Sequence, residues 1–510
     1  MSLTDALVVV CETHGSRIAV HHDGTEYTYA QLAEASARVA TGLADRGVVP
    51  GDTVGLLAPR GWWRCAAVLG IWRAGAAVVA LDPALPPERL ARIVGAAGTA
   101  LVLRDAAVPS VDLGSGYVGP DAHRAEATVQ GLHGAAAPGP APSLTGPVAY
   151  VVATSGSTGT PKCVAVPPVV LEDLASWHLD TWEWPRAPRT THTASVGFDV
   201  GFQELVATWT AGATLVVVDD TVRRDPFLLA ALLHDQAVAR AFLPVTSLHA
   251  LAVAVPVTGH RLTALREIVV SGERLVVNEE VRRLFAGLDA TLVNQYGPSE
   301  THVVTEHRLP GAPEDWPVHP PLGGPAVGAE LLRLADGVLA PFAEGDEAEL
   351  VVAGRCLALG YLGDDRLTHA KFPELPHVAG GSRRGYLTGD RVRLEDGLLH
   401  FVGRIDDQLK VRGYRVEPGE VEAVLGRVPG VRRAAVIGHG QDRTTALHAY
   451  VVPDPDASGP LDAAALRAAC AAALPDYMVP VRYIVVPELP LTASGKVARR
   501  ALRDSGTARV

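Results

Sequence analysis

The chain has 510 residues, 48% of them hydrophobic but only 5% aromatic, which allows two to four domains with mainly aliphatic cores. Its formal net charge of -11 argues against a nucleic-acid-binding surface, because neutralising phosphates needs clustered lysine and arginine. Residues 1–15 carry Asp5 and Glu12 around a short apolar run and lack a basic flank, so neither a signal peptide nor a membrane-spanning helix is expected there.

The cysteines give no sign of a metal site or of disulfides. There are five of them, and none of their spacings is typical of zinc binding or of a disulfide framework. A reducing compartment, the cytoplasm, is therefore the expected location.

Strand and helix patterns alternate through the first part of the chain. Residues 27–48 have apolar residues at helical spacing with Gly47 as a stop signal, and apolar runs then lead to Asp82. Residues 104–146 are typical of a loop rich in alanine, proline and glycine. Alternation resumes after this loop, so an α/β fold with buried strands is predicted.

The pattern changes near residue 403. Residues 337–354 and 396–418 are typical of antiparallel strands, and the following 100 or so residues alternate helix and strand, enough for a small domain. We therefore predict a large region over residues 1–404 and a small domain over residues 405–510.

Lysine is rare, since the chain contains only four against a much larger number of arginines. Lys162, Lys410 and Lys496 each lie in a glycine-bearing motif, and only Lys371 does not. A compact ammonium on a flexible stem is suited to phosphates and carboxylates, so these three lysines are candidates for such contacts. The alternative is that they are remnants of sequence drift.

The segment from Thr154 to Lys162 follows an apolar strand pattern and combines hydroxyl side chains with Gly156 and Gly159. Glycines let backbone N–H groups point inward and form an anion site. A Walker-type loop is excluded, because Pro161 precedes the lysine and Cys163 follows it. The segment predicts phosphate binding; the alternative is a flexible loop.

This segment resembles the phosphate loop of the adenylate-forming superfamily, and in particular of the amino-acid-activating adenylation domains of nonribosomal peptide synthetases. Other motifs of that family follow in order over essentially the whole chain. They are residues 27–32, 73–83, 294–300, 386–390, 403–417, 474–480 and 495–496. The resemblance implies a large N-terminal α/β region, with two packed βα layers and a β-barrel-like part, and a small mobile C-terminal α+β domain.

The resemblance also implies a site for ATP and Mg²⁺. Tyr296 would stack on adenine, and Glu300 would bind magnesium. Asp390 would accept from the ribose hydroxyls, and Arg404 would contact the ribose or a phosphate. The alternatives are core packing for Tyr296, a solvated loop carboxylate for Glu300 and a surface salt bridge for Arg404. The nucleotide contacts implied by the matched motifs are Thr154, Ser155, Gly156, Ser157, Thr158, Gly159, Lys162, Asn294, Tyr296, Gly297, Ser299, Asp390, Arg404 and Lys496.

Lys496 is expected to be catalytic together with Lys162 and Glu300, because its ammonium could contact both the substrate carboxylate and the phosphate as charge develops. It lies in the small domain, so domain closure must deliver it. Asp406 matches the hinge of the superfamily, about which that domain swings between an adenylating and a thioester-forming pose. Lys410, Arg412 and Gly413 would face the site in the second pose only; an ordinary basic hairpin is the alternative.

Asp199 indicates the substrate class, because in the amino-acid-activating branch an aspartate here pairs with the α-ammonium. The pocket residues matched in order are Asp199, Val200, Gln203, Phe242, Val269, Ser271, Gln295, Val303, Val304 and Lys496. This mostly apolar lining disfavours a charged substrate side chain. It resembles prolyl-activating pockets, although Ser271 and Gln295 depart from them, so proline or a proline-like acid is the leading expectation.

We therefore expect a free-standing enzyme that activates a neutral amino acid and loads a separate phosphopantetheinylated peptidyl carrier protein, with or without an activator of the MbtH-like type. Cys163 replaces the usual glycine after the loop lysine and Ser299 replaces a threonine. The alternatives are a coenzyme A ligase for an aryl or small carboxylic acid, a non-catalytic adenylate-binding relative, and a piece of a larger synthetase.

Overall fold

The computed structural model describes residues 2–99, 101–105, 108, 129–131, 146–156, 160–181, 188–411, 413–440, 446–455, 461–491 and 497–504. The chain forms two compact units. The first comprises residues 1–83, 94–152 and 163–405, and the second comprises residues 84–93, 153–162 and 406–510. The described part contains no helix long and apolar enough to cross a membrane.

The division at Ile405 to Asp406 lies one residue beyond the predicted domain boundary. Two short segments from the first third of the chain also belong to the second unit, which the sequence patterns did not indicate. One of them, residues 153–162, contains most of the predicted phosphate loop. The second unit is therefore discontinuous along the chain.

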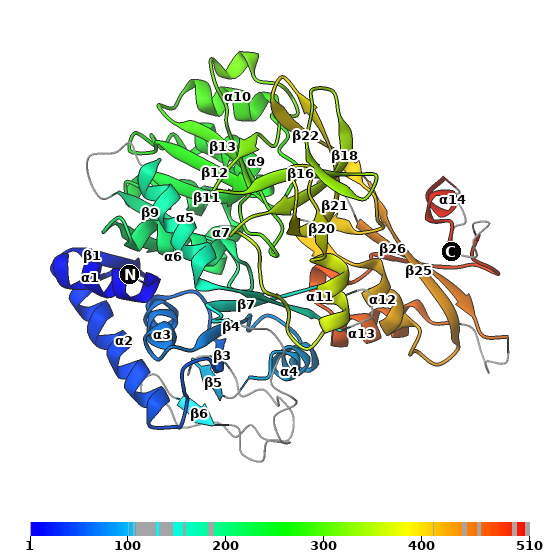
Figure 1. Cartoon of the computed structure of the whole chain (residues 1–510), viewed down its shortest axis with the longest axis horizontal. Helices are drawn as coiled ribbons and strands as arrows, with labels where there is room; N and C mark the ends of the chain where they lie inside the picture. The colour runs from blue at the N-terminus through cyan, green and yellow to red at the C-terminus, as the bar shows by residue number, and fades with distance from the viewer. Residues whose placement is uncertain are drawn as a thin grey trace. The chain divides into compact units, whose positions relative to one another are not determined.

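The first unit contains a nine-stranded sheet (Figure 1), which carries Phe242, Val269, Ser271 and Gln295 of the predicted pocket. Its strands follow the order β15-β14-β13-β12-β11-β9-β10-β1-β2, parallel from β13 to β1 and antiparallel at both edges. Central parallel strands are covered on both faces, which explains their continuous apolar runs. The bounds are β1 Ile18–His22, β2 Thr25–Thr28, β9 Arg189–His192, β10 Thr214–Val217, β11 Arg240–Pro244, β12 Glu267–Ser271, β13 Thr291–Tyr296, β14 Thr305–Arg308 and β15 Gly324–Pro325.

A second sheet has seven strands in the order β19-β8-β7-β4-β3-β5-β6. β3 pairs in parallel with β4 and β5, and β4 pairs in parallel with β7, as expected for strands joined by helices. With the nine-stranded sheet it supplies the two predicted βα layers. The bounds are β3 Thr53–Leu57, β4 Ala77–Leu81, β5 Leu101–Arg104, β6 Val129–Gly131, β7 Tyr150–Thr154, β8 Lys162–Val166 and β19 Gly360–Tyr361.

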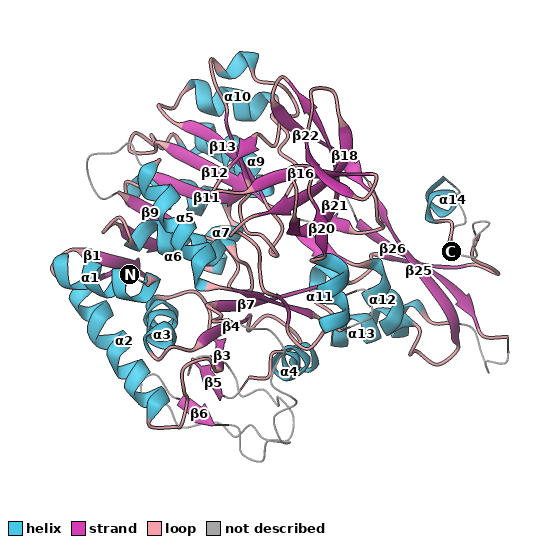
Figure 2. Cartoon of the chain, viewed as in Figure 1, coloured by secondary structure: helices cyan, strands magenta, loops and turns pink. Residues whose placement is uncertain are grey.

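Helices connect these strands (Figure 2). α2 begins after Thr28, whose hydroxyl accepts a hydrogen bond from the backbone N–H of Gln31 in a capping box, so the predicted helix at 27–48 is shorter at both ends. The bounds are α1 Leu3–Thr13, α2 Tyr29–Ala44, α3 Trp62–Arg73, α4 Pro87–Ala96, α5 Pro168–Asp180, α6 Val200–Trp209, α7 Asp220–Arg224, α8 Pro226–Asp235, α9 Val245–Thr258, α10 Glu279–Ala286, α11 Asp365–Lys371 and the 3-10 turn η1 Pro313–Asp315.

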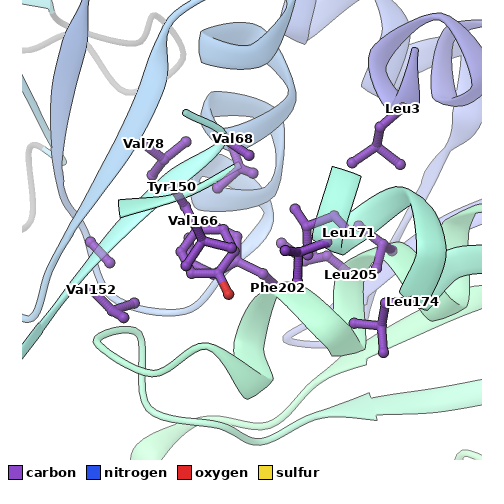
Figure 3. Close-up of a cluster of buried hydrophobic side chains, with 14 of the residues drawn as sticks. Leu3, Val68, Val78, Tyr150, Val152, Val166, Leu171, Leu174, Phe202 and Leu205 are labelled. Atoms are coloured by element: carbon purple, nitrogen blue, oxygen red, sulfur yellow. The ribbon is translucent and has the colours of Figure 1, made fainter. Parts of the chain in front are cut away.

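Helix α6 is fixed in the largest hydrophobic core of the first unit. The ring of Phe202 stacks on that of Tyr150 with centroids 4.1 Å apart, and Leu205 packs in the same cluster (Figure 3). The residues of α6 from Gly201 to Trp209 are all buried. Because the helix is enclosed, its N-terminal turn, which carries Asp199 and Gln203, has a defined position.

A third sheet of the first unit is antiparallel, with the order β17-β16-β18-β21-β20 and β22 paired to β21. Its two ends meet at a bridge between Leu339 and His377, which gives the barrel-like part that was predicted. Leu332, Leu339, Val351 and Ala353 form its interior. The bounds are β16 Glu330–Ala335, β17 Val338–Pro341, β18 Glu347–Ala353, β20 Glu374–Pro376, β21 Ser382–Glu395 and β22 Leu398–Arg404.

The C-terminal part of the second unit contains a two-stranded hairpin and a three-stranded sheet, β25-β26-β27. Its core is aliphatic, and Val421 and Leu466 pack there from two helices. This α+β arrangement matches the small domain that was expected. The bounds are β23 Leu409–Val411, β24 Tyr414–Val416, α12 Pro418–Leu425, β25 Val431–His439, β26 Ala446–Pro453, α13 Ala463–Ala473, η3 Asp476–Met478, β27 Arg482–Val485 and α14 Arg499–Asp504.

Candidate active site

The predicted phosphate loop joins the end of β7 to the start of β8. A Cβ atom added at Gly156 would lie 1.9 Å from the carbonyl oxygen of Thr160, so only glycine fits where the loop folds back on itself. The Thr154 hydroxyl is buried and has no hydrogen-bond partner within the described residues. A tight cradle with an unused donor suits a phosphate oxygen. Ser157, Thr158 and Gly159 lie outside the described residues.

Two donors of this loop hold carboxylate oxygens within the second unit. The Lys162 Nζ atom lies 2.9 Å from an oxygen of Glu417, and the Gly156 N–H donates to Glu420 at 3.1 Å. The Ser155 hydroxyl donates to the carbonyl of Arg415 at 2.9 Å. The carboxylates stand in for the anionic oxygens that a nucleotide would bring. The loop donors are thus able to bind such oxygens.

The second and third nucleotide motifs meet in the first unit, although 94 residues separate them. The Tyr296 hydroxyl donates to Asp390 at 2.6 Å, and the Arg404 guanidinium donates to the other oxygen of that carboxylate at 2.5 Å. Arg404 reaches Asp390 because the two are register partners on β21 and β22. Burial, and then the Asp390 charge, hold the pKa of Tyr296 well above its usual range. The phenol is therefore a fixed donor, and each Asp390 oxygen keeps a second lone pair for another donor.

The end of β13 and the loop that follows it support these residues. The Asn294 amide donates to the carbonyl of Pro321 at 2.8 Å, which gives this predicted nucleotide residue a structural contact. A Cβ atom at Gly297 would lie 1.6 Å from the carbonyl oxygen of His302, so this position also requires glycine. Ser299 is half-buried in the same loop.

Glu300, the predicted magnesium ligand, is completely buried, and its carboxylate accepts a hydrogen bond from the Tyr361 hydroxyl at 2.7 Å. The described residues contain no group of three or more histidine, cysteine or acidic side chains that could enclose a metal. Magnesium bound to ATP needs only one or two carboxylates, because phosphates and water supply its other ligands. The oxygen donor of Glu300 fits such a partial site, with Tyr361 fixing its orientation. Sequence reasoning missed Tyr361.

Asp199 caps helix α6 and is 7% exposed. One carboxylate oxygen accepts the N–H of Val200 at 2.8 Å, and the backbone carbonyl lies 3.3 Å from Nε2 of His302. His302 is buried, and burial lowers its pKa, so its imidazole is neutral. Asp199 forms no ion pair with a lysine or arginine among the described residues, so its second carboxylate oxygen can accept from a cationic ligand.

Several of the predicted pocket residues form a small apolar cluster. Phe242 and Val269 are register partners on β11 and β12, and Val293 of β13 completes the cluster with Val200 packed against it. The structure thus brings together side chains that are far apart in the sequence. The remaining apolar positions, Val303 and Val304, are buried in the main core, and Ser271 is half-buried at the end of β12.

Gln203 and Gln295, the two predicted pocket amides, contact each other. Gln203 Nε2 donates to Gln295 Oε1 at 2.9 Å and lies 3.1 Å from Nε2 of His178. Gln295 Nε2 in turn donates to Glu306 at 2.9 Å. The Gln203 Oε1 atom is buried and has no hydrogen-bond partner in the described part of the chain.

Charged residues connect the two ends of this chain of contacts. Glu306 lies 3.6 Å from Arg308, and Arg308 donates to Glu267 at 2.7 Å. Glu267 also accepts from Arg240, whose other nitrogen lies 3.4 Å from Nδ1 of His178. The contacts therefore close, and we call the set the polar ring: His178, Gln203, Arg240, Glu267, Gln295, Glu306 and Arg308.

Sequence reasoning found only the two glutamines of the polar ring. One signal was available, because Arg240 and Glu267 are the first residues of two otherwise apolar strands and are register partners. A charge at the start of a buried strand requires a partner, and opposite charges at matching positions of neighbouring strands supply one. His178 carried no comparable signal.

The remaining predicted residues belong to the second unit. Asp406 is its first residue after the boundary, and its carboxylate accepts the N–H of Gln408 at 3.2 Å. Gly413 has a φ of 83° in the turn of the β23–β24 hairpin, a conformation that favours glycine. Lys496 and Arg412 lie outside the described residues.

Two family models match the chain, the AMP-binding enzyme model over residues 7–362 and the AMP-binding enzyme C-terminal domain model over residues 420–496. The chain belongs to the AMP-binding enzyme family. A probable nonribosomal peptide synthetase of Salinispora arenicola, CymA, is 39% identical over 488 residues, which are 95% of this chain and 6% of that protein. This chain thus spans only a small part of the curated relative.

Solved structures agree with this assignment. The NRPS protein PA1221, with adenylation and PCP domains, is 26% identical with a TM-score of 0.80, covering 98% of this chain and 84% of that one. The amide bond synthetase McbA from Marinactinospora thermotolerans is 25% identical with a TM-score of 0.78 and complete coverage of both chains. This AMP-binding enzyme is therefore an adenylate-forming protein of the nonribosomal peptide synthetase type.

Proposed function

We propose that this AMP-binding enzyme activates a neutral amino acid with ATP and transfers it to the phosphopantetheine thiol of a separate peptidyl carrier protein. The observation that carries the amino-acid assignment is Asp199, a nearly buried carboxylate with a neutral histidine at its backbone and an apolar cluster beside it. An α-ammonium supplies the charge that such a carboxylate needs. Proline or a proline-like acid is the first substrate to test.

In the first step a carboxylate oxygen of the amino acid attacks the α-phosphorus of ATP, and the bond to pyrophosphate breaks. Lys162, the Thr154 hydroxyl and the backbone of the loop would hold phosphate oxygens, and Lys496 would contact the carboxylate and the phosphate together. Bound Mg²⁺ would offset phosphate charge from the side of Glu300.

Tyr296 would lie against the adenine, with Asp390 and Arg404 at the ribose. In the second step the carrier thiol, after giving its proton to solvent, attacks the acyl carbon and AMP leaves. A mobile C-terminal part, turning at Asp406, would place Lys410, Arg412 and Gly413 at the site for this step.

Pyrophosphate exchange tests the first step. We expect exchange that depends on one neutral amino acid or imino acid, with Asp199→Ala lowering kcat/KM for that amino acid by about a hundredfold or more. Asp235→Ala, an exposed aspartate at the end of α8, is the matched control. The proposal is wrong if no proteinogenic amino acid or common imino acid supports exchange, with or without an added MbtH-like protein.

The alternative function, a coenzyme A ligase, predicts different outcomes for these experiments. It requires that Asp199→Ala keep full activity and that a carboxylic acid without an amine give a coenzyme A thioester. A complete lack of ATP consumption with every acid would instead favour a non-catalytic protein.

A further inference from the structure

The amide oxygen of Gln203 is a buried acceptor that no described residue uses. The whole side chain has no exposed surface, and Oε1 has no partner in the described residues. A buried polar atom without a hydrogen bond costs about 1–3 kcal/mol, so such an atom calls for a partner. Gln203 lies one helical turn after Asp199, on the same face of α6.

The rest of the polar ring determines which Gln203 atom is left over. When Glu306 is ionised, it accepts from the Gln295 NH₂ group, and the Gln295 oxygen accepts from the Gln203 NH₂ group. The second hydrogen of that NH₂ group points to Nε2 of His178. The oxygen of Gln203 is then the free atom.

This arrangement needs a neutral His178 with its proton on Nδ1. Burial, together with the positive charge of Arg240 and the neighbouring His302, keeps the pKa of His178 well below its usual range, so the ring is neutral. The Nδ1 proton then faces the Arg240 guanidinium at 3.4 Å. The N–H groups of His178 and Arg240 are both donors, so their contact disfavours this arrangement. The repulsion between them is weak, because the two nitrogens are 3.4 Å apart.

A second arrangement follows when Glu306 takes up a proton. Its O–H group donates to the Gln295 oxygen, so both glutamine amides turn by 180°. The Gln203 oxygen then accepts from Gln295 and from Nε2–H of His178, while Nδ1 accepts from Arg240. Each of these contacts then joins a donor to an acceptor, and the NH₂ group of Gln203 becomes the free group.

The surroundings of Glu306 favour its protonated form. Burial raises its pKa, whereas the hydrogen bond from Gln295 and the charges of Arg308 and Arg240 lower it and Glu267 raises it again. Of these groups, Arg240 lies on β11, Glu267 on β12, and Arg308 on the same strand as Glu306, while the neutral Gln295 lies on β13. The net direction is upward, so Glu306 takes up its proton at a higher pH than an ordinary glutamate.

We propose that Gln203 makes a hydrogen bond to the substrate side chain with its free amide atom, and that Glu306, acting through Gln295, decides whether that atom is an acceptor oxygen or a donor nitrogen. The inference rests on the proposed function. With Glu306 ionised, a neutral side chain that carries an O–H or N–H donor is favoured. An unsubstituted proline ring offers no donor, whereas a hydroxylated ring does. Glu306 and His178 are positioning residues, since they act through other side chains.

The test uses the amino acid that supports pyrophosphate exchange in the full chain, together with two analogues. One analogue lacks the polar group of the side chain, and the other replaces the hydroxyl by a ketone or methyl ether, which can only accept. The series 4-hydroxyproline, 4-oxoproline and proline is one example. kcat/KM is measured from pH 6 to pH 9 for the wild type, Gln203→Leu and Glu306→Gln.

The wild type should prefer the donor-bearing compound over its deoxy analogue by about tenfold or more, and Gln203→Leu should remove the preference. The preference for the donor over the acceptor-only analogue should fall about tenfold as pH falls and Glu306 becomes protonated. In Glu306→Gln this ratio should not change with pH, because a glutamine does not titrate. Glu26→Gln is the control. Glu26 lies on β2 of the same sheet, a strand that carries no residue of the polar ring, so this variant should keep the pH dependence.

The outcomes separate the two proposals. Exchange with no amino acid contradicts the proposed function. Exchange with an amino acid whose side chain has neither donor nor acceptor contradicts only the role of Gln203. A pH-dependent ratio that survives in Glu306→Gln, with unfolding transitions that show the variant folded, contradicts the role of Glu306.

Discussion

At the scale of single residues, the site depends on side chains held by hydrogen bonds and on glycines that have no space for a larger side chain. Tyr296 and Arg404 hold both oxygens of Asp390, and Gly156 and Gly297 lie against carbonyl oxygens that leave no space for a Cβ atom. These contacts concern the proposed nucleotide site, and each can be tested by a change of one or a few atoms.

Tyr296→Phe removes only the hydroxyl that donates to Asp390 and keeps the ring proposed to lie on adenine. We expect the KM for ATP to rise several-fold and the free energy of unfolding to fall by about 1 kcal/mol. Exchange kinetics at varied ATP and urea unfolding measure the two effects. Tyr450→Phe, which removes a hydroxyl bonded to the Leu502 carbonyl, should lower stability without changing that KM. An unchanged KM in Tyr296→Phe would contradict the placement at the nucleotide.

Gly156→Ala should distort the phosphate loop, because the new methyl group would overlap the Thr160 carbonyl. The expected result is a loss of at least about tenfold in kcat/KM for ATP with a folded protein. Gly95→Ala is the control, since nothing lies within 4 Å of a Cβ atom there and alanine favours the helix. Equal activity of the two variants would argue against phosphate binding at this loop.

At the scale of elements, helix α6 connects the core to the substrate residues. Its Glu204 carboxylate is buried and accepts the N–H groups of Thr193 and Ala194 at 2.9 and 3.1 Å, with His192 at 2.6 Å. These bonds attach the helix to the end of β9, while Phe202 anchors the opposite side on Tyr150. The first turn of α6 therefore cannot shift independently of the sheet.

Glu204→Gln should loosen this attachment. One carboxylate oxygen accepts both backbone N–H groups, and the amide oxygen can replace it, but the NH₂ group would then replace the charged oxygen that lies against Nδ1 of His192. We expect the free energy of unfolding to fall by about 1–3 kcal/mol and the KM for the amino acid to rise more than the KM for ATP. Glu279→Gln on the exposed start of α10 is the control. If both KM values rose equally, α6 would not position the amino acid selectively.

At the scale of the whole molecule, the sequence could predict the layers and the order of motifs, because buried parallel strands and glycine-rich turns leave clear patterns. The chain divides between Ile405 and Asp406, and the sequence patterns change near residue 403. The sequence could not predict that residues 84–93 and 153–162 join the second unit, since their partners are more than 200 residues away. Nor could it predict His178 in the polar ring, because a single histidine on a helix forms no sequence pattern that identifies its hydrogen-bond partners.

The proposed catalysis in two poses can be tested at this scale. Lys496→Ala should reduce adenylate formation by about a hundredfold or more, whereas Lys410→Ala and Gly413→Ala should spare it and slow carrier loading. Pyrophosphate exchange and acylation of the carrier protein separate the steps. Lys371→Ala is the matched control, because it is the lysine outside the glycine-bearing motifs. Equal losses in both steps for Lys410→Ala and Gly413→Ala would contradict the two-pose assignment.

The polar ring and the apolar cluster beside it have a practical consequence for redesign. All of their residues lie between α5 and β14, in the single stretch 168–308. If pocket side chains were exchanged one at a time, each new side chain would face the native Glu306 and Arg240. Its hydrogen-bond donors could then face other donors. Transplanting the continuous stretch from a related protein would carry the charges along with the pocket, so chimeras joined at its ends should change selectivity with less loss of rate than point-by-point grafts.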